Sequence, residues 1–314
     1  MPKRRKKKSL AKNQPLGISF LLLVAYASLL LVLASLSIQE WRQHKNQVSG
    51  AEADVSAPLP ENEPGPAIPP PNEGKPVPPE TDMPNLSMLL PAKLPGELSV
   101  QLIDHDYYKL AYLESHEQAA WVAYSLTREK LGGTHRRKDQ FQEDHRVTTR
   151  SAHPDDYRFS GYDRGHLAPA ADFTFSEQAM EKSFYMSNIS PQVPGFNRGI
   201  WQKLEQQVRT WAREYEQLLV VTGPVFTQKI PTSIGENNVI VPDYFYKVLF
   251  DIQPPSYKML AFLLKNEKSS RPLLDYVLSV DSLEQFSGID FFFHLPDSIE
   301  YELEKQVIYE DWFE

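Results

Sequence analysis

The chain has 314 residues, a formal net charge of −8 at pH 7 and no cysteine. This length accommodates one catalytic-size domain of about 200 residues with accessory segments, and the absence of cysteine excludes thiol catalysis, cysteine-ligated zinc and disulfide bonds. Residues 1–50 hold nine Lys or Arg and one acid, so the remainder carries a net charge of −16, which argues against a protein that coats nucleic acid through bulk positive charge.

The N-terminus consists of a basic tail, residues 1–15, and an apolar segment, residues 16–38, which contains 23 residues and no charge. As a helix this segment would be about 34 Å long at about 1.5 Å per residue, enough for a bilayer core of about 30 Å. The basic tail predicts a cytoplasmic N-terminus, so we expect a single-pass anchor in the cell membrane with the rest of the chain on the extracytoplasmic side, periplasmic or external. The alternatives are a cleaved signal peptide, which would leave the domain secreted, and a buried core helix.

Residues 39–96 form the next segment, and residues 51–96 of it hold half of the 26 prolines. Such a composition cannot bury enough apolar surface to fold, and it favours an extended polyproline II conformation. We therefore expect a disordered spacer that holds the following domain away from the membrane. A proline-rich ligand for an SH3-type domain is the alternative.

Residues 97–314 have the pattern of a folded domain. Short runs rich in β-branched and aromatic residues, bounded by turn residues, predict strands over 119–127, 217–226, 244–252 and 257–265. The steps between Ile200, Leu204, Val208 and Trp211 predict a helix over residues 195–217.

Two shorter helices are expected around this pattern. One covers residues 176–186 with Ser176 as its N-cap, and the other covers 282–287 and is stopped by Gly288. Because strands and helices do not alternate regularly, we expect an α+β fold with a central antiparallel sheet flanked by helices.

A histidine with unusual neighbours lies in the stretch SGYDRGHLAPAADF, residues 160–173. Gly165 allows a close backbone approach that a Cβ would forbid, and Asp163 and Arg164 place a carboxylate and a guanidinium beside His166. A neutral imidazole accepts a proton near physiological pH, and arginine holds phosphate in a bidentate manner. This combination suits phosphodiester chemistry, whereas packing is the alternative role for an isolated histidine. His135, His145 and His153 lie in polar sequence and are expected to be solvated.

A second polar group follows in SNISPQVPGFNRGIWQKLE, residues 187–205. Asn197 and Glu205 are eight positions apart on the predicted helix, and side chains on a helix lean toward its N-terminus, so Glu205 can reach toward a centre near Asn197. An amide oxygen and a carboxylate acting through water suit Mg²⁺. The alternative is an ordinary capped helix with a wet polar face.

Together the two segments resemble the DNA/RNA non-specific endonucleases of the ββα-metal class. The resemblance rests on DRGHLAP, on SNISPQ, and on NRGIWQKLE, whose Asn197 follows His166 by 31 residues. It covers nearly all of the predicted domain, and it implies a ββα-metal motif within the α+β fold.

The resemblance also implies roles for individual residues. His166 would be the general base, Asn197 the direct protein ligand of Mg²⁺, with Mn²⁺ as a second option, and Glu205 would hold metal-bound water. Their implied action is hydrolysis of phosphodiester bonds in DNA and RNA, in which water is activated by His166 and the products carry 5′-phosphates.

Further residues have supporting roles by the same resemblance. Arg164 would contact phosphate, Asp163 would brace the motif, and Asn188 would help to order the site. An arginine upstream of DRGH would stabilise the pentacovalent phosphorus; Arg136 and Arg137 are the candidates, and the spacing favours Arg137.

The implied function is thus a membrane-anchored, Mg²⁺-dependent endonuclease with DNA and RNA as partners. Two alternatives remain open: a membrane-tethered nucleic-acid-binding module for DNA uptake, and a phosphodiesterase for small nucleotides. A homodimer is also left open. Because the domain is acidic, its binding of nucleic acid must depend on a local arginine cluster and is expected to be salt-sensitive.

Overall fold

The computed structural model describes residues 92–94, 100–253, 257–305 and 310–313. The chain divides into two compact units, 1–72 and 73–314, of which the first lies wholly outside the described residues. The basic tail (1–15), the predicted membrane segment (16–38) and almost all of the predicted linker (39–96) also lie outside them. In the described part of the chain, no helix has the length and apolar character needed to cross a bilayer.

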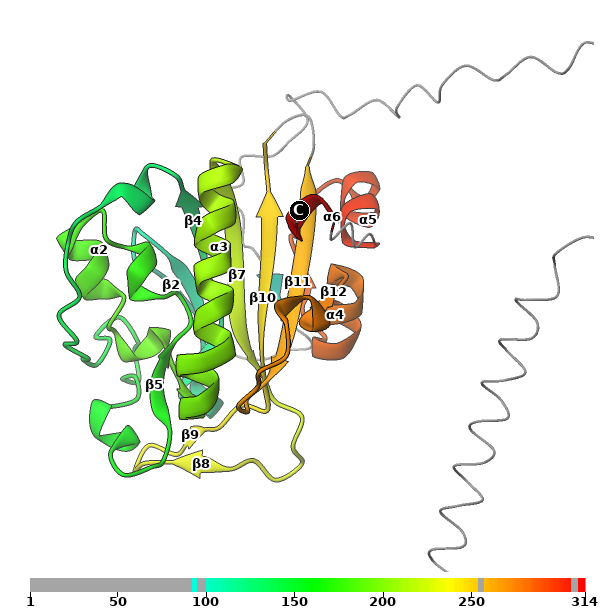
Figure 1. The fold of residues 1–314 in the computed structure, drawn as a ribbon. Coiled ribbons are helices and arrows are strands. Elements are labelled where there is room, and N and C mark those ends of the chain that lie inside the picture. The colour runs from blue at the N-terminus through cyan, green and yellow to red at the C-terminus, as the bar shows by residue number, and fades with distance from the viewer. Residues whose placement is uncertain (1–91, 95–99, 254–256, 306–309, 314) are drawn as a thin grey trace, which may run out of the picture. The chain divides into compact units, whose positions relative to one another are not determined.

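A seven-stranded sheet is the centre of the described fold (Figure 1). Its strand order is β12-β11-β10-β7-β4-β3-β2, and every neighbouring pair is antiparallel. The strands are β2 (Val100–Asp104), β3 (Lys109–Leu113), β4 (Gln118–Thr127), β7 (Gln217–Val225), β10 (Tyr244–Asp251), β11 (Lys258–Lys265) and β12 (Val277–Leu278). Four of them match the predicted runs to within one residue at each end, which confirms the antiparallel α+β expectation.

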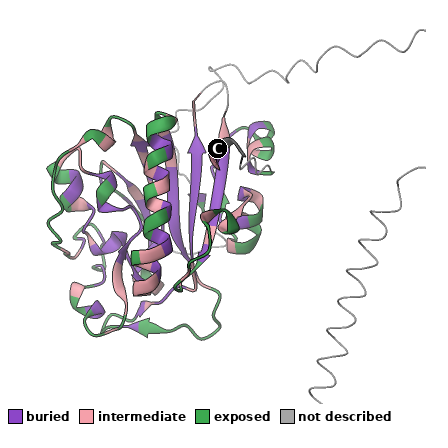
Figure 2. Ribbon diagram, viewed as in Figure 1, coloured by how far each residue is buried: buried purple, intermediate pink, exposed green. Residues whose placement is uncertain are grey.

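Both faces of this sheet are covered, and Figure 2 shows its central strands as buried. In β10, Phe245 and Leu249 belong to the apolar core beneath α3 (Gln202–Glu214), whereas Tyr246 and Val248 belong to the core on the opposite face. Helix α4 (Val280–Ser287) and the short pair β1 (Ala92–Lys93) and β13 (Asp290–Phe291) contribute to that opposite core. Two-sided burial explains why these strands read as nearly continuous apolar runs rather than as alternating ones.

The three predicted helices are present. Helix α2 (Glu177–Lys182) begins at Ser176, whose hydroxyl accepts a hydrogen bond from the Ala179 N–H, and α4 ends at Gly288 in the left-handed conformation, with φ of 72°. The longest predicted helix is interrupted. A π-helical turn, η7 (Phe196–Trp201), precedes α3, and Gly199 within it departs from helical geometry, with φ of −115° and ψ of −111°.

Several short elements complete the described fold. They are the hairpin of β5 (Asp163–His166) and β6 (Ile189–Gln192), the hairpin of β8 (Ser233–Ile234) and β9 (Val239–Ile240), and helices α5 (Asp297–Lys305) and α6 (Glu310–Phe313). Strand β1 precedes residue 97, where the sequence predicts that the domain begins, and it pairs with β13. A two-residue strand has no periodicity that a sequence pattern could reveal.

Candidate active site

The DRGH segment is strand β5, which pairs antiparallel with β6 so that His166 lies opposite Ile189 and Gly165 opposite Ser190. A Cβ on Gly165 would lie 2.2 Å from Cδ of Gln192, a fully buried side chain. Glycine is therefore required by close packing, as expected from the sequence.

One pocket of about 400 Å³ collects the predicted site residues from β5, from the π-helical turn and α3, and from the loop before Phe141. It is lined by six of the predicted residues: Arg137, Asp163, Arg164, His166, Asn197 and Glu205. The fold thus brings Asn197 and Glu205 to the histidine although 31 residues separate the first of them from it in the chain.

His166 is 7% exposed, and its Nε2 makes no hydrogen bond with any described residue. Its ring contacts Phe184 edge-on, with centroids 5.0 Å apart, and Phe141 at 5.6 Å. Burial, assisted by the positive charge of Arg137, lowers the pKa of His166 from 6.5 to about 3. The imidazole is therefore neutral at physiological pH, with a nitrogen that can accept a proton.

Asp163 connects the β-hairpin to the start of the helical segment. Its carboxylate accepts a hydrogen bond of 2.9 Å from Nδ2 of Asn197 and two from the guanidinium of Arg198, of 2.8 and 2.6 Å. Burial raises the pKa of Asp163, but these hydrogen bonds outweigh it and the net shift is downward. The ionised Asp163 fixes the orientation of the Asn197 amide.

The Asn197 and Glu205 side chains offer oxygen atoms to the same pocket. Because the Asn197 amide nitrogen is held by Asp163, the amide oxygen is left without a hydrogen bond from the described residues. The Glu205 carboxylate likewise accepts none from them, and burial raises its pKa. An amide and a carboxylate oxygen are hard donors, so these two residues fit a Mg²⁺ ion that keeps several of its waters.

A buried lysine that was not predicted as a site residue lies near Glu205. Lys247, in β10, is 1% exposed, its Nζ has no hydrogen-bond partner among the described residues, and this atom is 4.8 Å from the Trp201 ring centroid. Its charge opposes the upward pKa shift of Glu205, and burial lowers its own pKa. A lysine in the apolar run YFYKVLFDI is the signal that could have revealed it.

Asp172 and Arg209 extend this buried charge cluster and were also missed. Arg209 donates a hydrogen bond of 2.9 Å to Asp172, which also accepts one of 2.8 Å from the Tyr124 hydroxyl. Asp172 is 2% exposed, and burial raises its pKa despite the guanidinium. Arg209 also lines the pocket and so adds positive charge to it.

The upstream arginine that lines the pocket is Arg137, whereas Arg136 does not line it. The Arg137 guanidinium lies over the Phe184 ring, 5.3 Å from its centroid, and is hydrogen-bonded to Asp139. Arg164 also lines the pocket, but its Nε and one terminal nitrogen donate to the Pro154 carbonyl, at 3.2 and 2.7 Å.

Asn188 does not line the pocket, and its hydrogen bonds connect two segments of the surrounding chain. Its amide nitrogen donates to the carbonyls of Ala168 and Ser183, at 2.9 and 2.8 Å, and its oxygen accepts from the Ala168 N–H at 3.0 Å. These bonds attach the chain that follows His166 to the segment that leads into β6.

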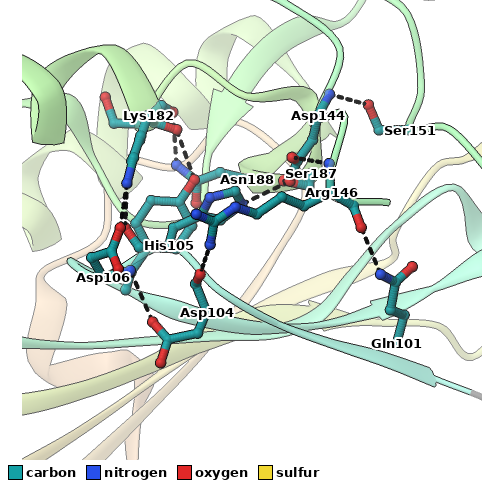
Figure 3. A network of polar contacts seen from close by, with 12 residues as sticks. Gln101, Asp104, His105, Asp106, Asp144, Arg146, Ser151, Lys182, Ser187 and Asn188 are labelled. Carbon is teal, nitrogen blue, oxygen red and sulfur yellow. Dashed lines mark hydrogen bonds and ion pairs between the residues drawn. The ribbon is translucent and has the colours of Figure 1, made fainter. Parts of the chain in front are cut away.

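Figure 3 shows a polar network that includes Asn188 and the buried residues His105, Asp144 and Ser187. The buried Asp144 carboxylate accepts a hydrogen bond of 2.6 Å from the Ser187 hydroxyl and lies 2.7 Å from Nε2 of His105. The histidines expected to be solvated, His135, His145 and His153, are exposed. His105 is instead a fully buried structural residue, and no feature of its neighbouring sequence distinguishes it.

A two-stranded antiparallel hairpin that leads into a helix, with a histidine on its first strand and an asparagine before the helix, is the arrangement of the ββα class of nucleases. The model of the DNA/RNA non-specific endonuclease family matches residues 87–298, and the chain belongs to this family and is an endonuclease.

Relatives support this assignment. The chain is 36% identical over 217 residues to mitochondrial endonuclease G from Homo sapiens. The aligned region covers 63% of this chain and 71% of that relative. It is 34% identical over 229 residues to nuclease C1 from Cunninghamella echinulata var. echinulata, with 67% and 89% covered. A crystal structure of the EndoG/EndoGI complex matches with a TM-score of 0.59 and 31% identity, over 65% of this chain and 89% of that one.

Proposed function

We propose that this endonuclease hydrolyses phosphodiester bonds of both DNA and RNA and depends on Mg²⁺ or Mn²⁺. We also propose that residues 16–38 hold it at the cell membrane, with its catalytic domain on the extracytoplasmic side. The observation that carries the catalytic part is that an unpaired imidazole nitrogen of His166 and an unpaired amide oxygen of Asn197 belong to one pocket.

His166 takes a proton from a water molecule, which attacks phosphorus in line with the departing 3′ oxygen, so the products carry 5′-phosphates. Arg137 and Arg164 hold the phosphate, and Arg137 stabilises the charge that develops on it. The chemistry that Mg²⁺ supplies when held by Asn197, with Glu205 acting through water, is charge neutralisation at the phosphate oxygens. Asp163 keeps the Asn197 amide turned so that its oxygen is free.

The range of substrates follows from the groups that line the pocket. The proposed contacts are with phosphate and carry no base information, so cleavage of DNA and RNA with little sequence preference is expected. Secretion after cleavage of the N-terminal segment would leave this activity unchanged and would alter only where it acts.

Purified full-length protein incubated with plasmid DNA and with RNA, with and without EDTA, tests the proposal. We expect both polymers to be degraded when Mg²⁺ is present and neither in EDTA. Binding without cleavage would contradict the proposal, and so would cleavage of dinucleotides with both polymers left intact.

Arg137 and Arg136 form a matched pair of variants. Arg137→Ala should lower kcat/KM on a short DNA substrate by about 10²-fold or more, because it removes a charge that acts in the transition state, as for an oxyanion-hole donor. Arg136→Ala should stay within about threefold, because that side chain does not line the pocket. Arg137→Lys should restore activity only in part, since ammonium lacks the planar guanidinium donors. Equal losses in the two alanine variants would contradict the role of Arg137.

Lys247→Met tests the buried charge beneath Glu205. Lys247 opposes the upward pKa shift of Glu205, so its removal raises that pKa further and leaves less carboxylate at neutral pH. We expect Mg²⁺-dependent activity at pH 7 to fall by about tenfold, the equivalent of about one pKa unit, and to recover as the pH rises toward 9. The Tm should fall, because the substitution takes a cation away from the buried carboxylates of Glu205 and Asp172.

The control is Lys265→Met, which removes an exposed lysine from the end of β11. It should leave the pH–activity profile as in the wild type. A Lys247→Met profile that coincides with it would exclude any electrostatic action of Lys247 on Glu205.

A further inference from the structure

Three carboxylates meet between the C-terminal helices, on the face of the sheet opposite the pocket. Asp281 and Glu284 are one turn apart on α4, Glu304 is on α5, and one oxygen of each lies within 4.8 Å of the others. The apolar side chains of α4 belong to the core opposite the one beneath α3, so this group is separate from the pocket that contains Asn197.

Within the described part of the chain, the Glu304 carboxylate lacks a partner for one of its oxygens. It is 4% exposed, and its Oε1 is buried without a hydrogen-bond partner among the described residues. A buried carboxylate oxygen normally has a donor or a cation beside it, because its desolvation is otherwise uncompensated.

No cationic side chain of the described residues neutralises these carboxylates. No described Lys or Arg forms an ion pair with Asp281, Glu284 or Glu304. The neighbouring Lys305 donates instead to the Tyr301 hydroxyl, at 3.2 Å, and Glu284 receives one hydrogen bond of 2.7 Å from the Phe291 N–H. Burial and the crowded carboxylates raise the pKa of Glu284 to about 7 and that of Glu304 to about 9.

We infer that Asp281, Glu284 and Glu304 form a second cation site, which binds Ca²⁺ and fastens α5 to α4. Carboxylate oxygens are the ligands that Ca²⁺ prefers, and the two partly exposed carboxylates leave room for the waters that complete its six to eight ligands. Mg²⁺ usually binds through one or two carboxylates and keeps several of its waters, so a group of three carboxylates favours the larger ion.

One of the three carboxylates lies outside the region that matches the family model. The match to the family model ends at residue 298, before Glu304. Occupation of the site would therefore stabilise the C-terminal helices without taking part in phosphodiester cleavage.

The test uses the full-length chain with Asn197→Ala, which removes the proposed catalytic ion site from the measurement. Calorimetric titration with CaCl₂ should show one bound ion, and the Tm should rise by several degrees relative to EDTA. MgCl₂ should bind more weakly at this site.

Two further substitutions in the same background decide the assignment. Glu304→Gln should weaken Ca²⁺ binding by about tenfold or more, whereas Glu302→Gln, at an exposed position on the same helix, should leave it unchanged. In EDTA, Glu304→Gln should melt at or above the temperature of its parent, which shows that it folds. As a single substitution, Glu304→Gln should keep wild-type nuclease activity in Mg²⁺. No Ca²⁺ binding in the parent, or equal affinity in the two glutamine variants, would overturn the inference.

Discussion

His166→Ala is expected to lower kcat/KM for DNA cleavage by at least about 10²–10⁴-fold while the protein stays folded. The reason is that a positioned general base supplies an acceleration of this size, and the imidazole is the neutral, unpaired base in the pocket. Initial rates on a short duplex, with circular dichroism for the fold, measure both effects. His153→Ala, at an exposed histidine, serves as the control. Cleavage by His166→Ala at near wild-type rate would reject the role of this residue.

The same variant should also change the pH dependence of the free energy of unfolding, which is measured without substrate. Because the pKa of His166 is about 3 in the fold and about 6.5 in an unfolded chain, the unfolded state takes up a proton first as the pH falls below 6.5. Wild-type protein should therefore lose stability between pH 6.5 and 3, by up to about 1.4 kcal/mol per pH unit. Denaturant unfolding of His166→Ala should show a correspondingly weaker pH dependence.

Asn197→Ala is expected to reduce Mg²⁺-dependent cleavage by about 10³-fold, the equivalent of about 4 kcal/mol in the barrier. The substitution removes the amide oxygen proposed to hold the ion, but Asp163 keeps its two hydrogen bonds from Arg198 and so stays in place. Activity measured across a MgCl₂ titration should show a raised half-saturating concentration.

Gln202→Ala is the matched control, because Gln202 also lines the pocket and is exposed at the start of α3. Asn197→Asp is informative in a different way. It restores an oxygen ligand but replaces the N–H donor to Asp163 with a second carboxylate, so it should recover activity only in part. Full activity in Asn197→Ala at ordinary Mg²⁺ would show that the ion is held elsewhere.

The sheet could be predicted from the sequence because its strands are buried on both faces. Runs such as YFYKVLFD carry enough β-branched and aromatic residues to stand out, and they match β10 and its neighbours closely. Strands β1 and β13 have two residues each and are defined only by their mutual pairing, so no local pattern could indicate them.

The site was predictable in part for a different reason. Asp163 and His166 belong to one short motif and Asn197 to a second motif 31 residues further on, and the resemblance of both motifs to those of the endonuclease family carried the prediction. The break at Gly199 was not predictable, because the residues around it keep a helical apolar pattern. The lysine in the apolar run of β10 marks Lys247 as unusual, but that Lys247 and Asp172 lie beside Glu205 follows only from the tertiary packing of β10 and of the chain after β5 against α3.

An anomalous difference map from crystals of His166→Ala with Mn²⁺ and a short uncleaved DNA is the most direct measurement of the central claim. We expect a Mn²⁺ peak at the Asn197 amide oxygen, near the Glu205 carboxylate, with the scissile phosphate between the ion and the position vacated by the imidazole. A phosphate bound away from residue 166, or a pocket in which Asn197 contacts no ion, would contradict it.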